Sequence, residues 1–242
     1  ADRYGEPLES VDVLDANNWL STPCVVNDSY FLKIISGQNS IVHALLTTGR
    51  NIGVFSSGRE GFFEHFGTPV QMAEHELEAT RQIRDLGVNA PEPIEAFEFE
   101  GLGVLVLEYL PSFRALDDLD TRRVLAMAPG LFASLARMHA AGIAHGDLRA
   151  ENVLVADGEL YVIDATNVRA DAMADARSYD LACALAALEP LIGADAAIAA
   201  SADHYPNDAL LSAERFLDFV NIRPDHRFDA VALKAEIEKR VV

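Results

Sequence analysis

Cysteine and long apolar runs are scarce in this chain of 242 residues. Its two cysteines, Cys24 and Cys183, form no CxxC pair and have no Cys/His spacing suited to zinc, so we expect buried free thiols. The sequence has no run of about 18 or more apolar residues, which argues against a membrane-spanning helix. Residues 1–10 are acidic and polar, unlike a signal peptide. We therefore expect a cytoplasmic protein.

Positive charge is also scarce, because 38 acidic residues stand against 19 basic ones and the formal net charge is -19. Such a chain repels nucleic acid, so we expect no direct nucleic-acid binding. Only three of the basic residues are lysines (Lys33, Lys234 and Lys239), and the acids are spread along the chain. Hyperthermophiles would enrich lysine together with glutamate. The composition is instead typical of a salt-adapted cytoplasm, and it predicts a halophilic origin.

The first part of the chain has the patterns of a small antiparallel sheet with one helix. Residues 11–35 alternate short β-rich runs with turn residues, and residues 94–99 and 103–110 predict a hairpin around Glu100 and Gly101. Between them, residues 69–86 predict a helix that has a proline in its first turn and ends at Gly87. A five-stranded lobe with one main helix is expected.

The second part is expected to be mostly helical. Residues 122–141 show helical spacing, residues 152–155 and 160–163 flank a turn at Asp157 and Gly158, and the pattern beyond Asp175 is helical. The predicted fold is therefore α+β with two lobes, residues 1–110 as a small antiparallel-sheet lobe and residues 111–242 as a mostly helical lobe. The length is sufficient for two small lobes.

The polar loop at residues 145–152 is the most informative segment, because it lies between a helix and an apolar strand. It places Asp147 and Asn152 five positions apart, and Asp164 ends the following apolar hairpin. Phosphoryl transfer needs a carboxylate beside the incoming hydroxyl and oxygen ligands for metal ions, and this set offers both. The alternative is that Asp147 and Asn152 are solvated polar residues of a capped turn. Asp164, at the end of the following hairpin, argues against this alternative.

Lys33 is unusual because it occupies the middle of an apolar strand in a chain that has almost no lysine. A lysine on a solvated face would more readily have been replaced. We therefore single it out as a candidate functional residue.

The loop and the hairpin together resemble the kinase catalytic loop HxDxxxxN and the metal-binding aspartate that opens DFG, here written Asp164-Ala165-Thr166. His145-Gly146-Asp147-Leu148 in place of HRDL looks like RIO kinases, their telomere-maintenance relatives, lipopolysaccharide kinases and aminoglycoside phosphotransferases. The resemblance to this atypical branch of the protein-kinase-like superfamily extends over roughly residues 10–190. It implies ATP and Mg²⁺ as cofactors.

By this resemblance, Asp147 accepts or orients the proton of the acceptor hydroxyl. Asn152 and Asp164 hold Mg²⁺, and Arg149 reaches the γ-phosphate. His145 is expected to pack within the loop as a structural residue.

The resemblance also assigns nucleotide contacts in the first lobe. Lys33 binds the α- and β-phosphates and pairs with a helix glutamate, for which Glu76 fits the register better than Glu74 or Glu78. The backbone carbonyl of Glu108 and the N–H of Leu110 bind adenine. Asp180, in a Tyr-Asp-Leu-Ala run, is expected to anchor the catalytic loop.

Two departures from the family pattern leave the acceptor and the activity open. No GxGxxG occurs between Val11 and Lys33, where the first hairpin instead carries Asn17-Asn18. A glycine-rich stretch from Gly49 to Gly61 follows Lys33, and it is either a lid over the site or a plain connection. Only 15 residues separate Asp164 from Asp180, which is too short for a full activation segment. We expect phosphate transfer to a hydroxyl of a protein, as in RIO kinases, or of a small molecule. The alternative is a pseudokinase that binds nucleotide and regulates a partner.

Overall fold

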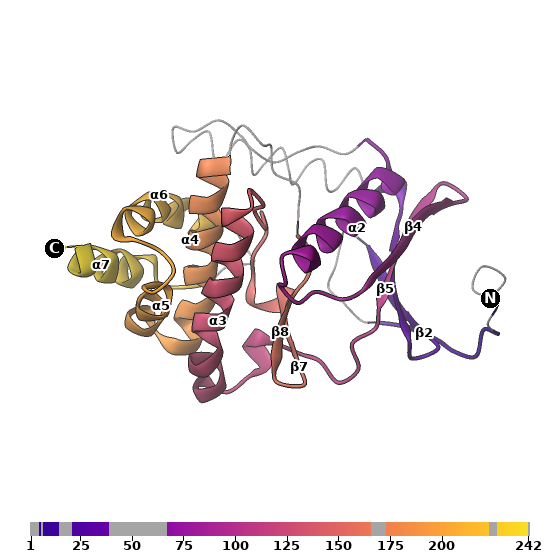
Figure 1. The fold of residues 1–242 in the computed structure, drawn as a ribbon, viewed down its shortest axis with the longest axis horizontal. Helices are drawn as coiled ribbons and strands as arrows, with labels where there is room; N and C mark the ends of the chain where they lie inside the picture. Colours follow the sequence, from indigo (N-terminus) through magenta and orange to yellow (C-terminus); the bar gives the residue numbers. More distant parts are fainter. Residues whose placement is uncertain are drawn as a thin grey trace.

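A five-stranded antiparallel sheet forms the first lobe of the computed structural model, which describes residues 5, 7–14, 21–38, 67–165, 173–222 and 227–241 (Figure 1). The strand order is β1-β2-β3-β5-β4, so β1 and β4 are the two edges. The strands are β1 (Val11–Val13), β2 (Thr22–Val26), β3 (Tyr30–Ile35), β4 (Pro93–Phe99) and β5 (Leu102–Glu108).

Helix α2 (Pro69–Asp85) covers one face of this sheet. Thr68 caps its start by accepting a hydrogen bond from the N–H of Gln71 at 3.3 Å, and Pro69 occupies the first turn, where no N–H is needed. The helix buries one stripe at helical spacing, which consists of Ala73, Leu77, Thr80 and Ile83. Burying a leucine or isoleucine side chain contributes about 1.5–3 kcal/mol, so Leu77 helps to hold the helix on the sheet and Ile83 helps to hold it on the second lobe.

Gly103 in β5 allows the start of α2 to approach the sheet closely. A Cβ atom on Gly103 would lie 2.2 Å from the carbonyl oxygen of Pro69. Because no side chain fits there, the glycine sets the position of the first turn of α2.

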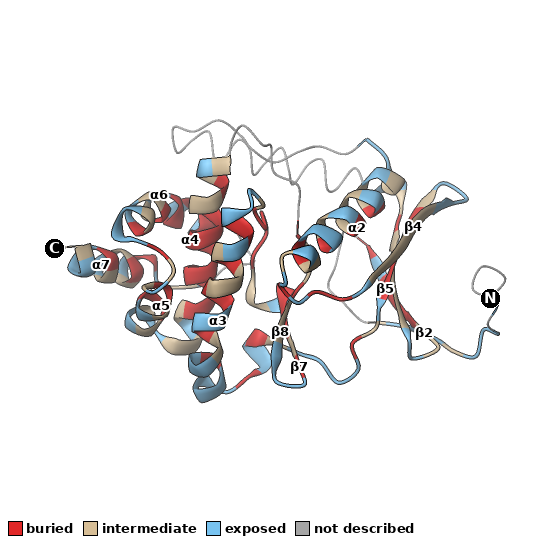
Figure 2. Cartoon of the chain, viewed as in Figure 1, coloured by how far each residue is buried: buried red, intermediate tan, exposed pale blue. Residues whose placement is uncertain are grey.

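The second lobe is helical and is built around α4, whose residues are buried along most of the helix (Figure 2). Helices α3, α5, α6 and α7 pack around α4. Their bounds are α3 (Thr121–Ala140), α4 (Met173–Ile192), α5 (Ala194–Ser201), α6 (Asn207–Ile222) and α7 (Ala230–Val241). A three-stranded antiparallel sheet, ordered β6-β7-β8, lies where this lobe meets the first one, with strands β6 (Arg114–Ala115), β7 (Val153–Ala156) and β8 (Glu159–Val162).

The two lobes are joined by packing and by hydrogen bonds. Arg137 of α3 donates from Nη1 to the carbonyl of Gly87 at 2.6 Å, and the N–H of Val162 donates to the carbonyl of Asn89 at 2.9 Å. A small apolar cluster spans the same junction and contains Ile83, Val88, Ala90, Met138, Val162 and Ala165. The junction therefore fixes the end of β8 relative to α2.

The predicted fold class is confirmed, because a small antiparallel-sheet lobe with one main helix is followed by a helical lobe. The expected division at residues 110–111 falls between β5 and β6. Asn17-Asn18 and the stretch from Gly49 to Gly61 lie outside the described residues. Within the described part of the chain, no helix is both long and apolar enough to cross a bilayer.

Candidate active site

Lys33 of β3 makes ion pairs with two carboxylates from different parts of the fold. Its buried Nζ lies 2.7 Å from Oε1 of Glu76, on α2, and it also pairs with Oδ1 of Asp164, which follows β8. Glu76 is half-buried, whereas Glu74 and Glu78 are exposed on the other side of the helix. Of the three glutamates considered as partners, Glu76 is the one in contact with Lys33.

The two carboxylates that contact Lys33 differ in how firmly they are ionised. Burial alone would lower the pKa of Lys33, but Asp164 and Glu76 outweigh burial and keep it above its ordinary value, so the lysine is an ammonium. Burial raises the pKa of Glu76 to about 7, with the attraction of Lys33 opposing the rise. For Asp164 the attraction of Lys33 outweighs burial, and the pKa falls. Asp164 is therefore the firmly ionised carboxylate of the pair.

The loop that carries Asp147 is held by a buried aspartate of α4. Asp180 accepts hydrogen bonds from the N–H of His145 at 2.5 Å and from the N–H of Gly146 at 2.8 Å. Gly146 has a φ of 78°, a conformation that favours glycine. The two backbone contacts fix the turn immediately before Asp147.

His145 is a fully buried structural link in the same loop. Its Nε2 donates to the carbonyl of Ile163 at 3.0 Å, and its Nδ1 accepts from the N–H of Asp147 at 3.2 Å. Burial is the main cause that lowers its pKa, which matches a neutral ring with its proton on Nε2. The ring therefore couples the Asp147 backbone to the residue that precedes Asp164.

Asn152 is oriented by a contact within the loop. Its Nδ2 donates to the carbonyl of Asp147 at 2.8 Å. This contact uses the amide nitrogen, so the amide oxygen is the side-chain atom that could bind a metal ion. The Ile163 N–H donates to the carbonyl of Asn152 at 3.1 Å. Asp164 itself has a φ of 62°, an uncommon conformation for a residue other than glycine.

Arg149 brings positive charge to the loop at residues 145–152. Its Nε lies 3.5 Å from Oδ2 of Asp147, and its Nη1 pairs with Oε1 of Glu151. The guanidinium also acts on Asp164 and contributes to lowering the pKa of that carboxyl. Arg149 thus acts electrostatically on the carboxylates of Asp147 and Asp164, both of which are predicted to take part in phosphoryl transfer.

Comparisons with known proteins find relatives of the chain in sequence and in fold. A family model for the RIO domain matches residues 67–179, just under half of the chain. The chain is also similar to the KEOPS complex subunit Bud32 of Pyrococcus abyssi (strain GE5 / Orsay), with 28% identity over 109 residues, which are 44% of this chain and 49% of that protein. It thus spans about half the length of this curated relative.

A solved structure with the same fold supports the fold assignment. A type VIII aminoglycoside-3'-phosphotransferase matches with a TM-score of 0.55 and 16% identity, covering 88% of this chain and 94% of that one. The chain therefore has a protein-kinase-like fold. The kinase domain of Mycobacterium tuberculosis PknI, solved as a point mutant, matches with a TM-score of 0.43 and 14% identity, covering 98% of each chain.

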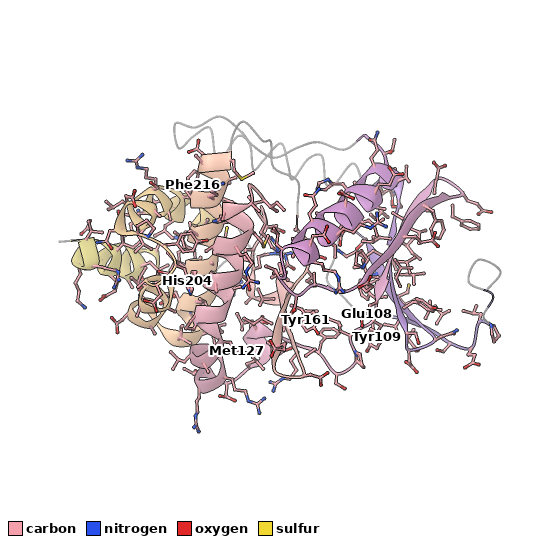
Figure 3. All side chains as sticks on the ribbon, in the orientation of Figure 1. Glu108, Tyr109, Met127, Tyr161, His204 and Phe216 are labelled. Carbon is pink, nitrogen blue, oxygen red and sulfur yellow. The ribbon has the colours of Figure 1, made fainter. Side chains whose placement is uncertain are left out.

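The segment that connects the two lobes begins at the end of β5 (Figure 3). Glu108 uses its side chain locally, since its Oε2 accepts from the N–H of Glu92 at 3.0 Å, and its own N–H donates to the Glu92 carbonyl at 2.8 Å. The N–H of Tyr109 donates to the carbonyl of Ser29 at 3.0 Å. The Glu108 side chain is therefore occupied, and the adenine contacts assigned to this segment concern only the backbone of Glu108 and Leu110.

Two buried residues behind the loop at residues 145–152 were not predicted. His139 of α3 and Tyr205, between α5 and α6, continue the hydrogen bonds of Asp180 away from the loop. In the sequence, His139 is a lone histidine in an apolar helix, and Tyr205 lies 66 positions away from it. Nothing local in the sequence connects them.

Proposed function

We propose that the chain is an ATP- and Mg²⁺-dependent phosphotransferase that transfers the γ-phosphate to a hydroxyl group. The arrangement that best supports this proposal is the contact of Lys33 with both Glu76 and Asp164, close to a loop that presents Asp147 and Asn152. An ammonium in this position suits the α- and β-phosphates of the nucleotide.

The residues present suit a magnesium ion that is shared with a nucleotide. Magnesium is usually held by one or two protein oxygen ligands together with substrate phosphates. Asp164 offers an ionised carboxylate and Asn152 offers its amide oxygen, whereas the described residues contain no ready-made cluster of three or more His, Cys, Asp or Glu ligands. When bound, the ion would neutralise charge on the phosphates during transfer.

The remaining roles in phosphoryl transfer are assigned to groups of the protein. In the transfer, the acceptor oxygen forms a bond to the γ-phosphorus, the bond to ADP breaks, and the hydroxyl proton passes toward Asp147. Arg149, whose guanidinium is next to Asp147, would bind the γ-phosphate. The backbone carbonyl of Glu108 and the N–H of Leu110 would bind adenine.

We favour a protein hydroxyl as acceptor. The RIO domain match supports this choice, whereas the short segment between Asp164 and Asp180 argues only against a conventional Ser/Thr kinase with a full peptide platform. The Bud32 relative is named as a subunit of a complex, which makes association with a protein partner part of the proposal. A small-molecule hydroxyl is the second acceptor class.

The decisive test is transfer of label from γ-labelled ATP with Mg²⁺, using the protein itself and casein as protein acceptors and kanamycin as a small hydroxyl-rich acceptor. Asp147→Asn should lose turnover by about 10²-fold or more, since it removes the proton acceptor, while it still binds nucleotide. Asp157→Asn is the matched control, because Asp157 lies in the exposed β7–β8 turn.

The absence of GxGxxG between Val11 and Lys33 favours one rival function, a pseudokinase that binds nucleotide and regulates a partner. Nucleotide binding without label transfer or ATP hydrolysis in the unsubstituted protein would support the pseudokinase and contradict the transferase. Label on casein would support the protein-directed reading, and label on kanamycin alone would replace it with a small-molecule kinase.

A further inference from the structure

Three buried side chains form a line of hydrogen bonds that ends on the catalytic loop. The hydroxyl of Tyr205 lies 2.8 Å from Nδ1 of His139, and Nε2 of His139 lies 3.1 Å from Oδ2 of Asp180. The three residues come from the α5–α6 connection, the end of α3 and the middle of α4.

The chemistry of the groups fixes the direction of these bonds. An ionised carboxylate only accepts hydrogen bonds, so Nε2 of His139 carries the proton that it shares with Asp180. In the neutral ring, Nδ1 of His139 is then the acceptor, and the donor is the hydroxyl of Tyr205. Burial, followed by the nearby charge of Asp180, raises the pKa of Tyr205, which agrees with a phenol that keeps its proton.

Burial makes each bond hard to replace. Tyr205 is 9% exposed, His139 4% and Asp180 0%. Without the tyrosine hydroxyl, Nδ1 of His139 would be a buried acceptor that has lost its donor, which is costly in the protein interior.

The tyrosine ring is held independently of its hydroxyl. It packs edge-to-face on Phe132, with ring centroids 6.3 Å apart, and the N–H of Tyr205 donates to the carbonyl of Ser201 at 3.0 Å. Replacing Tyr205 by phenylalanine should therefore remove the hydroxyl and keep the packing.

We propose that Tyr205 is a positioning residue for Asp147. Its hydroxyl orients His139, His139 holds the carboxylate of Asp180, and Asp180 holds the N–H groups of His145 and Gly146 directly before Asp147. The kinetic consequence of this role rests on the proposed phosphotransferase activity, whereas its structural consequence does not.

The structural arm of the test measures amide hydrogen exchange by NMR in Tyr205→Phe. Protection at the N–H groups of His145 and Gly146 should fall by about tenfold, because Asp180 is held less firmly. Protection at Val106, in the other lobe, should stay unchanged. Tyr161→Phe is the matched control, since Tyr161 is a half-buried tyrosine of β8 outside this line of bonds.

A loss of protection that is uniform across both lobes would indicate global destabilisation and would overturn the proposal. Unchanged protection at His145 and Gly146 would overturn it as well.

The kinetic arm separates kcat from KM. Tyr205→Phe should lower kcat by about tenfold and leave KM for ATP within about twofold, because the nucleotide contacts assigned to Lys33 lie elsewhere. In a His139→Gln background, the further effect of Tyr205→Phe should be much smaller, since the tyrosine acts through the histidine. Full additivity of the two substitutions, or an unchanged kcat, would contradict the role.

The two arms also distinguish this proposal from the proposed function. If the unsubstituted protein transfers no phosphate, the phosphotransferase assignment fails, and the exchange data alone decide whether Tyr205 positions the loop. If it transfers phosphate and Tyr205→Phe changes neither kcat nor local protection, only the Tyr205 assignment fails.

Discussion

Lys33 and Asp164 are 131 positions apart in the chain, yet their ion pair joins the sheet lobe to the end of β8 in the helical lobe. The first prediction follows from this contact. Asp164→Asn should lower the affinity for Mg²⁺·ATP by about 100-fold or more, because it removes the ionised oxygen ligand assigned to the metal. Asparagine is chosen because it tolerates the φ of 62° at this position better than alanine does.

Calorimetric titration with ATP, in the presence and absence of Mg²⁺, measures this effect. Asp157→Asn serves as the matched control, since it makes the same chemical change in an exposed turn. Mg²⁺-dependent affinity that survives in Asp164→Asn would remove Asp164 from the metal site.

Lys33→Met should lower turnover by several orders of magnitude, because it removes the charge assigned to the phosphates. The structure adds an expected cost in stability, since the substitution leaves Glu76 and Asp164 close together without the ammonium between them. Without the lysine, the pKa of Glu76 should lie above its present value of about 7.

The Lys33→Met variant should consequently lose less stability at pH 6, where Glu76 is protonated, than at pH 8. Thermal unfolding at both pH values, next to a turnover assay, tests the prediction. A loss of stability that does not depend on pH would argue against the charge triad of Lys33, Glu76 and Asp164, and normal turnover would remove Lys33 from the site.

The contribution of Glu76 to the free energy of unfolding should fall as pH rises. Its folded pKa of about 7 lies above the ordinary value of 4.5, so the folded protein binds more protons than the unfolded chain between these two values. The contribution is therefore fully present below pH 4.5 and is lost as pH rises through 7, by about 3 kcal/mol at most. His145, whose pKa is lowered, acts in the opposite direction below its ordinary value of 6.5.

Glu76→Gln isolates this contribution because it leaves His145 in place. The free energy of unfolding of the unsubstituted protein, relative to Glu76→Gln, should decrease from pH 5 to pH 7.5 in urea titrations. A difference that increases with pH would mean that the folded pKa of Glu76 is depressed.

The sequence predicted the parts of the site that lie close together in the chain. Asp147, Asn152 and Asp164 could be selected together because the loop and the following hairpin are continuous, and Lys33 stood out because the chain has almost no other lysine. Their catalytic and metal-binding roles remain proposals.

The long-range parts could not be predicted from the residues alone, for physical reasons. Glu76 was selected as the partner of Lys33 by the family register, because a pattern of three alternate glutamates does not fix how α2 is rotated on the sheet. The line from Asp180 through His139 to Tyr205 joins α4, α3 and the α5–α6 connection, and no spacing rule connects these segments. The close approach at Gly103 likewise depends on where the start of α2 lies on the sheet.

Gly103→Ala should destabilise the protein by about 1–3 kcal/mol, because the new Cβ would lie 2.2 Å from the backbone carbonyl of Pro69 and the start of α2 must move. The same movement should weaken the contact between Glu76 and Lys33. Gly37→Ala is the matched control, since a Cβ there meets nothing within 4 Å. Urea unfolding of both variants is the measurement, and equal stabilities would contradict the close packing at Gly103.

Salt should stabilise the protein, which is the expectation that follows from the proposed halophilic origin. With a net charge of -19, the acidic groups repel one another in the compact state. The range of this repulsion shrinks as the Debye length falls from about 30 Å at 0.01 M salt to about 3 Å at 1 M. The melting temperature should therefore rise from low to molar KCl.

The choice of salt matters for this measurement. Potassium sulfate is an unsuitable substitute for KCl, because sulfate also strengthens apolar burial. Screening of the repulsion acts mostly below about 0.5 M, so a continued rise above that concentration would indicate bound cations or hydration in addition. A melting temperature that stays flat or falls across the whole KCl range would contradict salt adaptation and leave the acidic composition without a role in stability.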